Sequence, residues 1–373
     1  MGAPKCPVCG RRMARNGKTS AGRTRWRCAG CGASSTARID SSAKALSLFL
    51  GWLLSRGRQS DMPGAGRTFR RKTARFWEMW PMPPKVEGPR RVVYVDGIHL
   101  GRKAVVLIAS DEEHVLGWHP CRSENSRAWS ALMSRIAAPE VAVSDGGDGF
   151  AKALRATWPG TRHQRCAFHA FSQVRRCTTA RPKTQAGAEL YGLARSLLGV
   201  GSLREADAWV SSLLEWCGRW AGLLAETTAG EDGRGRPAHE RLVKARGSLV
   251  RLVSQGTLFT YLDPGLAEGG PLPATNNRME GGVNSRLRAM LRDHRGLSLE
   301  RRLKAVFWWC YAHSPSPLPA SELLRVMPTD RSIGAIYDRL EERGRLEGTI
   351  PQWGDAVVWG ELHRSEPYRM DWD

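Results

Sequence analysis

The chain has few acidic residues and no long apolar run. Its 373 residues include 36 Asp and Glu against 57 Lys and Arg, a net charge of +21. The longest apolar stretches, 45–54 and 306–312, are shorter than the ~18 residues that a membrane-spanning helix needs, and the first residues lack an apolar signal-peptide core. We therefore expect a cytoplasmic, nucleoid-associated protein with no membrane partner. The positive charge favours a nucleic-acid partner over a basic surface that is merely solvated.

The cysteines are too few and too unevenly placed for a disulfide framework. Nine are present, and four of them form two C-x-x-C pairs: Cys6, Cys9, Cys28 and Cys31. Two such pairs, 18 residues apart, are typical of a tetrahedral zinc site in which a hairpin brings the pairs together. A redox dithiol pair is the alternative. We expect residues 1–40 to form a zinc ribbon with one structural Zn²⁺, and Gly10 and Gly32 to lie in its tight turns.

Residues 41–80 show the pattern of two amphipathic helices. The first repeats apolar residues at helical spacing: Leu46, Phe49, Leu50, Leu53 and Leu54. The second is expected to begin near Thr68, a suitable N-cap. Its buried stripe comprises Phe69, Thr73, Phe76, Trp77 and Trp80. Its other side carries the cations Arg70, Arg71, Lys72 and Arg75. We predict a helix-turn-helix that places these cations on DNA; an ordinary helical pair with a solvated basic face is the alternative.

Beyond a proline-rich linker, the pattern changes to strands and then to alternating strands and helices. Strands are expected at 91–96, 103–110, 114–121 and 140–145, with a last short one within 161–171, and helices at 126–137 and 150–159. This order predicts a mixed α/β sheet. From 171 to 270 there is almost no strand signal, so we expect helices there. Trp209, Trp216 and Trp220 share one helix face, and we expect them in the core of this segment rather than on a base-stacking surface.

Two of the expected strands end in Asp-Gly, at Asp96 and Asp145. In a parallel pair, both acids would meet at the carboxyl ends of neighbouring strands, where α/β sheets bind ligands. Two carboxylates held that close repel each other, and Mg²⁺ ions remove the cost because hard cations prefer oxygen ligands. Two such ions can activate the attacking oxygen and stabilise the leaving one in phosphoryl transfer. Asp148 lies past the strand and ranks second to Asp145. Ordinary Asp-Gly turns are the alternative.

A third acid is expected on a helix late in the chain. Residues 275–296 read as a helix capped by Thr275 or Asn276. Its apolar stripe comprises Met279, Val283, Leu287, Met290 and Leu291. Glu280 opens this helix, is followed by two glycines and stands among arginines, so it is the best candidate for the third metal ligand; a surface charge is the alternative. Two of the arginines are expected to contact DNA: Arg286 and Arg288.

Together these motifs resemble the Mutator-like group of DDE transposases of bacterial insertion sequences. The resemblance is carried by YVDG at Asp96, VSDGGDGF at Asp145, RCAFH with Cys166 and His169, and TNNRMEGGVNSRLRAMLRDHRG at Glu280. It covers about residues 1–315. It implies a ribonuclease-H-like core, residues 90–170 and 271–313, with Asp96 on the first strand, Asp145 on the fourth and Glu280 on a late helix. Residues 171–270 would then be an all-helical insertion.

The resemblance also implies an activity. A transposase of this kind binds the terminal inverted repeats of its element, cleaves them with two Mg²⁺ ions and joins the freed 3′-hydroxyl to target DNA, acting as a homodimer or higher oligomer. A zinc-ribbon regulator with an inactive α/β part and a ribonuclease-H-like nuclease without strand transfer are the alternatives. The pair Cys166 and His169 fits a buried packing pair as well as a metal or DNA contact. Residues 322–373, with a helix around 333–340, have no assigned role.

Overall fold

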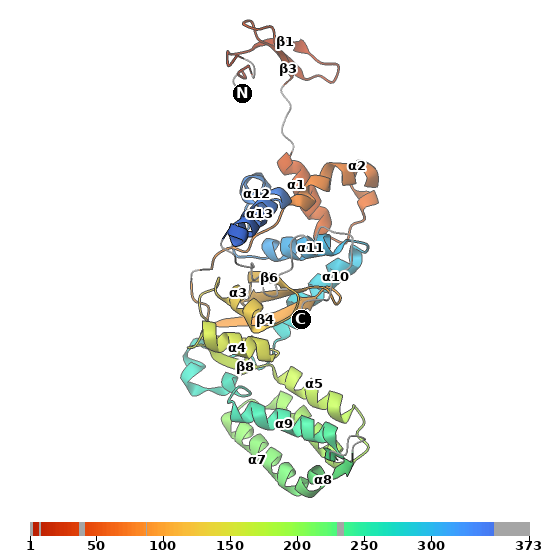
Figure 1. The fold of residues 1–373 in the computed structure, drawn as a ribbon, viewed down its shortest axis with the longest axis vertical. Helices are drawn as coiled ribbons and strands as arrows, with labels where there is room; N and C mark the ends of the chain where they lie inside the picture. Colours follow the sequence, from red (N-terminus) through yellow and green to blue (C-terminus); the bar gives the residue numbers. More distant parts are fainter. Residues whose placement is uncertain (1–2, 7–8, 37–41, 87, 230–234, 347–373) are drawn as a thin grey trace.

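The computed structural model describes the chain except residues 1–2, 7–8, 37–41, 87, 230–234 and 347–373 (Figure 1). Near the N-terminus, three short strands form an antiparallel sheet in the order β1-β2-β3. Their bounds are β1 Ala14–Lys18, β2 Thr24–Arg27 and β3 Ser34–Thr36. The predicted hairpin between the two cysteine pairs is therefore present, as β1 and β2.

A five-stranded mixed sheet, in the order β6-β5-β4-β7-β8, lies at the centre of the fold. The strands are β4 Val92–His99, β5 Val105–Ser110, β6 Val115–Cys121, β7 Val141–Ser144 and β8 Arg162–Arg165. The first three pair antiparallel, and β7 and β8 run parallel to β4. The mixed α/β sheet predicted from the alternation of strands and helices is confirmed.

Side chains alternate across β4 and divide the core into two layers, as the two-residue period of a strand requires. Val93 and Val95 pack with α3 Ser126–Met133 and α4 Asp148–Thr157 on one face. Tyr94 and Ile98 face the other layer, which holds α10 Ser285–Asp293 and α11 Leu299–Ala312. Asp96 has the same parity as Tyr94 and Ile98, so it lies on the α10 face.

The predicted helical pair shares the α10-side core. It comprises α1 Ser42–Leu53 and α2 Ala65–Thr73, with 3₁₀ turns at Gln59–Asp61 and Ala74–Glu78. Trp77 packs edge-on against Phe49, with ring centroids 5.0 Å apart, and both belong to the same hydrophobic cluster as α11. The expected start at Thr68 is wrong: α2 begins three residues earlier, with Gly64 as its N-cap at a φ of 86°, because glycine adopts that left-handed conformation without strain.

Five helices between β8 and residue 255 form a separate layer with its own core (Figure 1). They are α5 Ala167–Thr178, α6 Gln185–Ser196, α7 Leu203–Arg219, α8 Ala221–Ala225 and α9 Glu240–Ser254. Trp209 and Trp216 are buried in this core, as expected, and their indole N–H groups donate to the carbonyls of Leu193 and Ala186. The expectation of almost no strand here misses a two-stranded ribbon, β9 Thr227–Ala229 and β10 Gly235–Pro237.

The C-terminal helices are anchored on the core by a buried lysine. They are α12 Ala320–Val326 and α13 Asp330–Leu346, which contains the predicted helix at 333–340. Lys304 on α11 is fully buried, and its Nζ lies 2.6 Å from an oxygen of Asp330 and 2.5 Å from Glu300. The rest of the C-terminal unit, 347–373, lies outside the described residues. Among the helices that the structure describes, none combines the length and the apolar character needed to cross a membrane.

Candidate functional site

The four predicted zinc ligands lie together in the N-terminal sheet. The sulfurs of Cys6, Cys9, Cys28 and Cys31 all lie within 4.8 Å of one another. Two of the sulfur–sulfur distances are 3.5 Å and 3.4 Å. Tetrahedral Zn–S bonds of ~2.3 Å place sulfurs about 3.8 Å apart, so the spacing suits one Zn²⁺.

The two cysteine pairs share one backbone hydrogen bond and one glycine conformation. The N–H of Gly10 donates to the carbonyl of Cys6, and that of Gly32 to Cys28, each at 2.9 Å. Both glycines have a φ near 70°, so the turn glycines were predicted correctly. Backbone N–H groups of Cys31 and Gly30, together with the Cys9 side chain, lower the pKa of Cys28 to about 6. The N–H of Arg11 lowers the pKa of Cys9, but hydrogen bonds to the other three thiols outweigh it and raise that pKa. Zinc binds the thiolate form of cysteine.

Asp96 lies opposite Asp145 in the parallel register of the central sheet. Val92 pairs with Val141 and Tyr94 with Val143, an offset of 49 residues that would bring Asp96 level with Asp145. The prediction that Asp96 ends its strand is wrong, because β4 continues to His99 through pairing of Asp96 with Ile108 on β5. The neighbouring strand β7 does end, at Ser144. Asp96 therefore has a strand partner on the β5 side but none on the β7 side.

Asp96 is held by hydrogen bonds to both carboxylate oxygens. The N–H of Gly97 donates to one at 2.8 Å, and Asn284 donates to the other at 2.9 Å. Burial raises the pKa of Asp96 to about 7, and the charges of Asp145, Glu280 and Glu124 act in the same direction. Three other acids therefore act on Asp96, and a divalent cation bound beside it would favour its ionised form.

Asp145 directly follows β7, and one of its oxygens accepts the N–H of Gly147 at 3.2 Å. Its charge contributes to the raised pKa of Asp96. Asp148, the weaker alternative, is exposed and begins α4, one turn further from the end of the strand. The geometry favours Asp145.

Glu280 lies in a π-helix, Arg278–Asn284, that leads into α10. The expected side-chain cap at Thr275 or Asn276 is wrong: Asn277 occupies the N-cap position without a side-chain hydrogen bond, and the buried Asn276 side chain donates instead to the carbonyl of Val95 at 2.9 Å. That bond ties the start of the π-helix to β4 directly beside Asp96. The π-helix ends at Asn284, whose side chain reaches Asp96.

The Cys166 and His169 pair contacts Glu280. Nε2 of His169 lies 2.7 Å from a Glu280 oxygen. The Cys166 side chain raises the pKa of His169 against the opposing effect of burial. Burial raises the pKa of Cys166, but hydrogen bonds from His169 and from the N–H of Asn276 outweigh it and lower that pKa. The pair thus connects Glu280 to the segment that Asn276 anchors.

Glu124 is a fourth acid of the site that the sequence analysis missed. It follows β6, and an oxygen of its carboxylate lies 3.0 Å from Nε2 of His99. Burial raises the pKa of Glu124, and the charge of Asp145 adds to the effect. Gly97 leaves room for it, since a Cβ there would lie 2.4 Å from Oε1 of Glu124. In the sequence, the only indication of Glu124 was that an acidic residue follows the third predicted strand.

Among the described residues, the four cysteines form the group whose ligand atoms lie within 4.8 Å of one another; the carboxylates around Asp96 are spaced more widely. The basic residues singled out in the sequence are exposed: Arg70, Arg71 and Lys72 on α2, Arg75 in the 3₁₀ turn that follows it, and Arg286 and Arg288 on α10. The guanidinium of Arg75 already has contacts within the protein: it donates to Ser42 at 2.9 Å and lies over the ring of Phe76.

Two comparisons with known proteins bear on the family. Residues 99–173 match the model of the MULE transposase domain, a segment that includes Asp145, Cys166 and His169 but neither Asp96 nor Glu280. The chain is 31% identical over 97 residues to the transposase for insertion sequence element IS6120 of Mycolicibacterium smegmatis. That match covers 22% of this chain and 30% of the relative, so the chain aligns with less than a third of that protein. The two findings agree in supporting a Mutator-like transposase, as the resemblance of the motifs implied.

Proposed function

We propose that the protein is a DDE transposase that binds the ends of its insertion sequence and carries out strand cleavage and strand transfer with divalent metal ions. The observation that carries the proposal is the convergence on Asp96. The sheet register puts it opposite Asp145, Asn276 and Asn284 bring the Glu280 segment over it, and the charges of both acids act on it. The match to a transposase domain and the transposase relative point the same way.

The sheet supports a ribonuclease-H-like core as part of the proposal. Three antiparallel strands are followed by two strands parallel to the first, in the order β6-β5-β4-β7-β8. Asp96 then lies on the first strand of the core and Asp145 after the fourth. The helical layer enters after β8 and leaves before the π-helix, so a long insertion separates Asp145 from Glu280 without disturbing the sheet.

Asp96, Asp145 and Glu280 would hold two Mg²⁺ ions. Such a pair activates the attacking oxygen and stabilises the leaving oxygen in an in-line phosphoryl displacement. The protein's own task is positioning: Gly97 and Asn284 fix the orientation of the Asp96 carboxylate, and His169 restrains that of Glu280. Metal sites tolerate little displacement of their ligands, so these restraints favour a rigid site.

The basic surface would supply affinity for DNA. The net charge is +21, and the exposed cations of α2 and α10 flank the same layer of the core that holds Glu280. Neutralising phosphates releases counterions, which gives strong but salt-sensitive binding. The zinc ribbon, a helix-turn-helix role for α1 and α2, and a homodimer or higher oligomer on paired ends complete the proposal.

The experiment is incubation of the protein with Mg²⁺ and a labelled duplex that carries the terminal inverted repeat of its element. Cleavage at the repeat boundary and joining to a second DNA molecule support the proposal. Cleavage without joining indicates a ribonuclease-H-like nuclease instead. Sequence-specific binding without cleavage indicates a zinc-ribbon regulator, an outcome that the convergence of acids on Asp96 argues against.

A further inference from the structure

A cavity of about 490 Å³ opens beside the turn that follows Asp145. The turn and the start of α4 supply Gly147 and Lys152, β8 supplies Arg165, and α9 with the loop after it supplies Arg251 and Thr257. The volume lies within the range of about 300–1,000 Å³ found for small-molecule sites. The cavity thus lies between the central sheet and the helical layer, next to one of the proposed metal ligands.

The lining of this cavity is strongly positive. Its charged residues are four cations and one acid: Lys152, Arg155, Arg165, Arg251 and Asp148. His163 also lines it but adds no charge near neutral pH, because burial and then the charge of Arg165 lower its pKa to about 4. The N-terminus of α4, capped by Gly147 without a side-chain hydrogen bond, adds a partial positive charge. An anion is the ligand that this surface favours.

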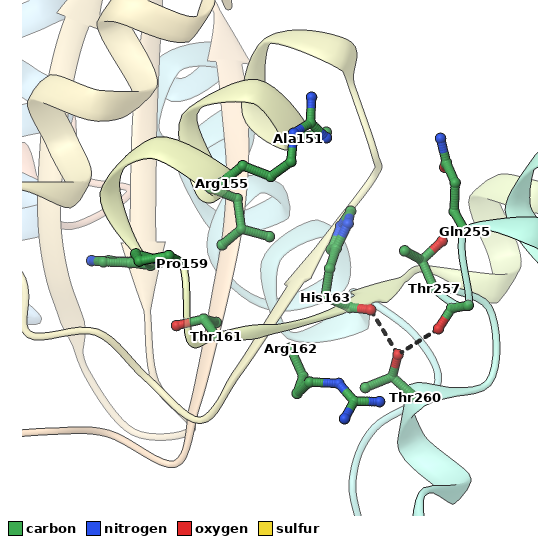
Figure 2. Close-up of a pocket in the computed structure, with 12 residues that line it drawn as sticks. Ala151, Arg155, Pro159, Thr161, Arg162, His163, Gln255, Thr257 and Thr260 are labelled. Carbon is green, nitrogen blue, oxygen red and sulfur yellow. Dashed lines mark hydrogen bonds between the residues drawn. The ribbon is translucent and has the colours of Figure 1, made fainter.

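Two buried donors in the cavity have no hydrogen-bonding partner among the described residues. Arg165 is 8% exposed, yet its Nε and Nη1 are unpaired, and so is Oγ1 of Thr257. Thr257 also lines the neighbouring pocket drawn in Figure 2, where the hydroxyl of Thr260, in contrast, donates to the carbonyl of His163 at 2.7 Å. A buried donor left unpaired costs about 1–3 kcal/mol, so a bound acceptor would remove a real penalty.

The backbone is shaped around Arg165. A Cβ at Gly146 would lie 2.4 Å from Cδ and 2.5 Å from Nη1 of Arg165, and Gly146 has a φ of 79°. The N–H of Arg165 donates to the carbonyl of Thr257 at 2.7 Å, which fixes the two donors relative to each other. The turn after Asp145 therefore makes room for a guanidinium whose Nε and Nη1, both without a partner among the described residues, suit oxygen acceptors.

We propose that this cavity binds a phosphate group of the DNA backbone, with Arg165 and Thr257 as its direct donors and Lys152 and Arg251 as flanking charges. The proposal rests on the proposed function and adds a second DNA contact to it. A guanidinium and a hydroxyl match the acceptor oxygens of a phosphodiester. Because Gly146 and Gly147 line the cavity and directly follow Asp145, the bound phosphate would fix the strand beside the acidic site.

The test is a scan of end DNA in which one backbone phosphate at a time is replaced by a neutral methylphosphonate. Binding is measured without added divalent metal, which leaves the structural zinc in place, at constant ionic strength for the wild type, Thr257→Val, Lys152→Gln and Arg165→Lys. The matched control is Arg204→Gln on α7, an exposed arginine outside the cavity lining. Lys152 is exposed, so its variant keeps the test informative if Arg165→Lys folds poorly.

At one position, neutralising the phosphate should weaken wild-type binding about tenfold, the effect expected when a hydrogen bond to a charged group is removed. The same replacement should lower the affinity of the cavity variants much less, because these variants no longer hold that phosphate. It should lower the affinity of Arg204→Gln as much as that of the wild type. If the replacement lowers the affinity of the cavity variants and of the wild type equally at every position, the proposal is overturned.

Inorganic phosphate and a nucleoside monophosphate distinguish a free ligand from DNA. If either of them protects the wild type but not Thr257→Val against thermal unfolding, while the DNA scan shows no coupling, the site serves a free phosphate and the DNA assignment is overturned. Because the scan is run without Mg²⁺, it does not depend on cleavage. Coupling without any cleavage in Mg²⁺ would refute the proposed enzymatic activity and leave the phosphate site supported.

Discussion

Replacement of Asp96 by Asn should stabilise the protein when no divalent metal is present. The pKa of Asp96 rises from 3.8 to about 7 in the folded protein, first through burial and then through neighbouring acids. One pKa unit corresponds to ~1.4 kcal/mol, so the carboxylate destabilises the fold by at most roughly 4 kcal/mol above pH 7. Partial exposure of Asp96 reduces this destabilisation. An Asn side chain also accepts the hydrogen bonds from Gly97 and Asn284 less well than a carboxylate does. We therefore expect Asp96→Asn to raise the free energy of unfolding by about 1–3 kcal/mol.

The sign of the pH dependence follows from the same shift. The unfolded chain releases the Asp96 proton near pH 4, whereas the folded protein keeps it to about pH 7. The contribution of Asp96 to the free energy of unfolding of the wild type should therefore fall as the pH rises from about 4 to 7. The extra stability of Asp96→Asn should be greatest at pH 8 and absent near pH 4. Urea unfolding in EDTA at several pH values measures this.

Mg²⁺ should reverse the order of stability. A ligand at 100 times its dissociation constant stabilises the folded state by ~2.7 kcal/mol, and Asp96→Asn should lose most of that gain. Asp207→Asn, an exposed acid on α7, is the control and should keep it. Equal stabilisation of the wild type and Asp96→Asn by Mg²⁺, or a variant less stable than the wild type at pH 8 in EDTA, would refute the reasoning.

Three further predictions concern other parts of the chain. Cys28→Ser should remove the one zinc ion seen by native mass spectrometry of the wild type; a metal-free but folded wild-type ribbon would contradict the zinc site. Lys304→Met should lower the free energy of unfolding by about 3–5 kcal/mol in urea, because Asp330 is left without its buried partner; a decrease under 1 kcal/mol would show that the pair does not anchor α13. Neutralising Arg70 and Arg71 should flatten the slope of log affinity against log salt by roughly 0.9 for each phosphate that the protein no longer neutralises, and an unchanged slope would exclude α2 from the DNA interface.

Local patterns predicted the strands and the helices of the layers well. The apolar runs of the sheet, the buried stripe that runs from α2 past the 3₁₀ turn after it, and the tryptophan core of the helical layer depend on periodicity that a short window contains. The knuckle turns were equally local, because a C-x-x-C-G segment nearly determines its own backbone. The acids Asp96, Asp145 and Glu280 could be singled out because each stands beside glycine at the end or start of an apolar run.

What escaped prediction depends on pairing between distant segments. An acid after an apolar run reads as the end of a strand, yet β4 continues because β5 pairs with it beyond Asp96. The bond from Asn284 to Asp96 spans 188 residues, and no local signal specifies it. Glu124 joins the site only through the folding of β6 beside β5 and β4. The side-chain cap expected at Asn276 failed for a similar reason, because that side chain donates to Val95 on the distant strand β4.

The central claim, that Asp96, Asp145 and Glu280 hold the catalytic metals, is tested most directly by single-turnover cleavage of end DNA in Mg²⁺, with binding measured in parallel in Ca²⁺. Asp96→Asn, Asp145→Asn and Glu280→Gln should each bind end DNA at least as well as the wild type, because a negative charge facing phosphate is gone. Each should lower the cleavage rate by ~10³-fold or more, and double variants should be little worse than single ones because the acids act as a unit. Cleavage by Asp96→Asn at near the wild-type rate, with binding intact, would contradict the account.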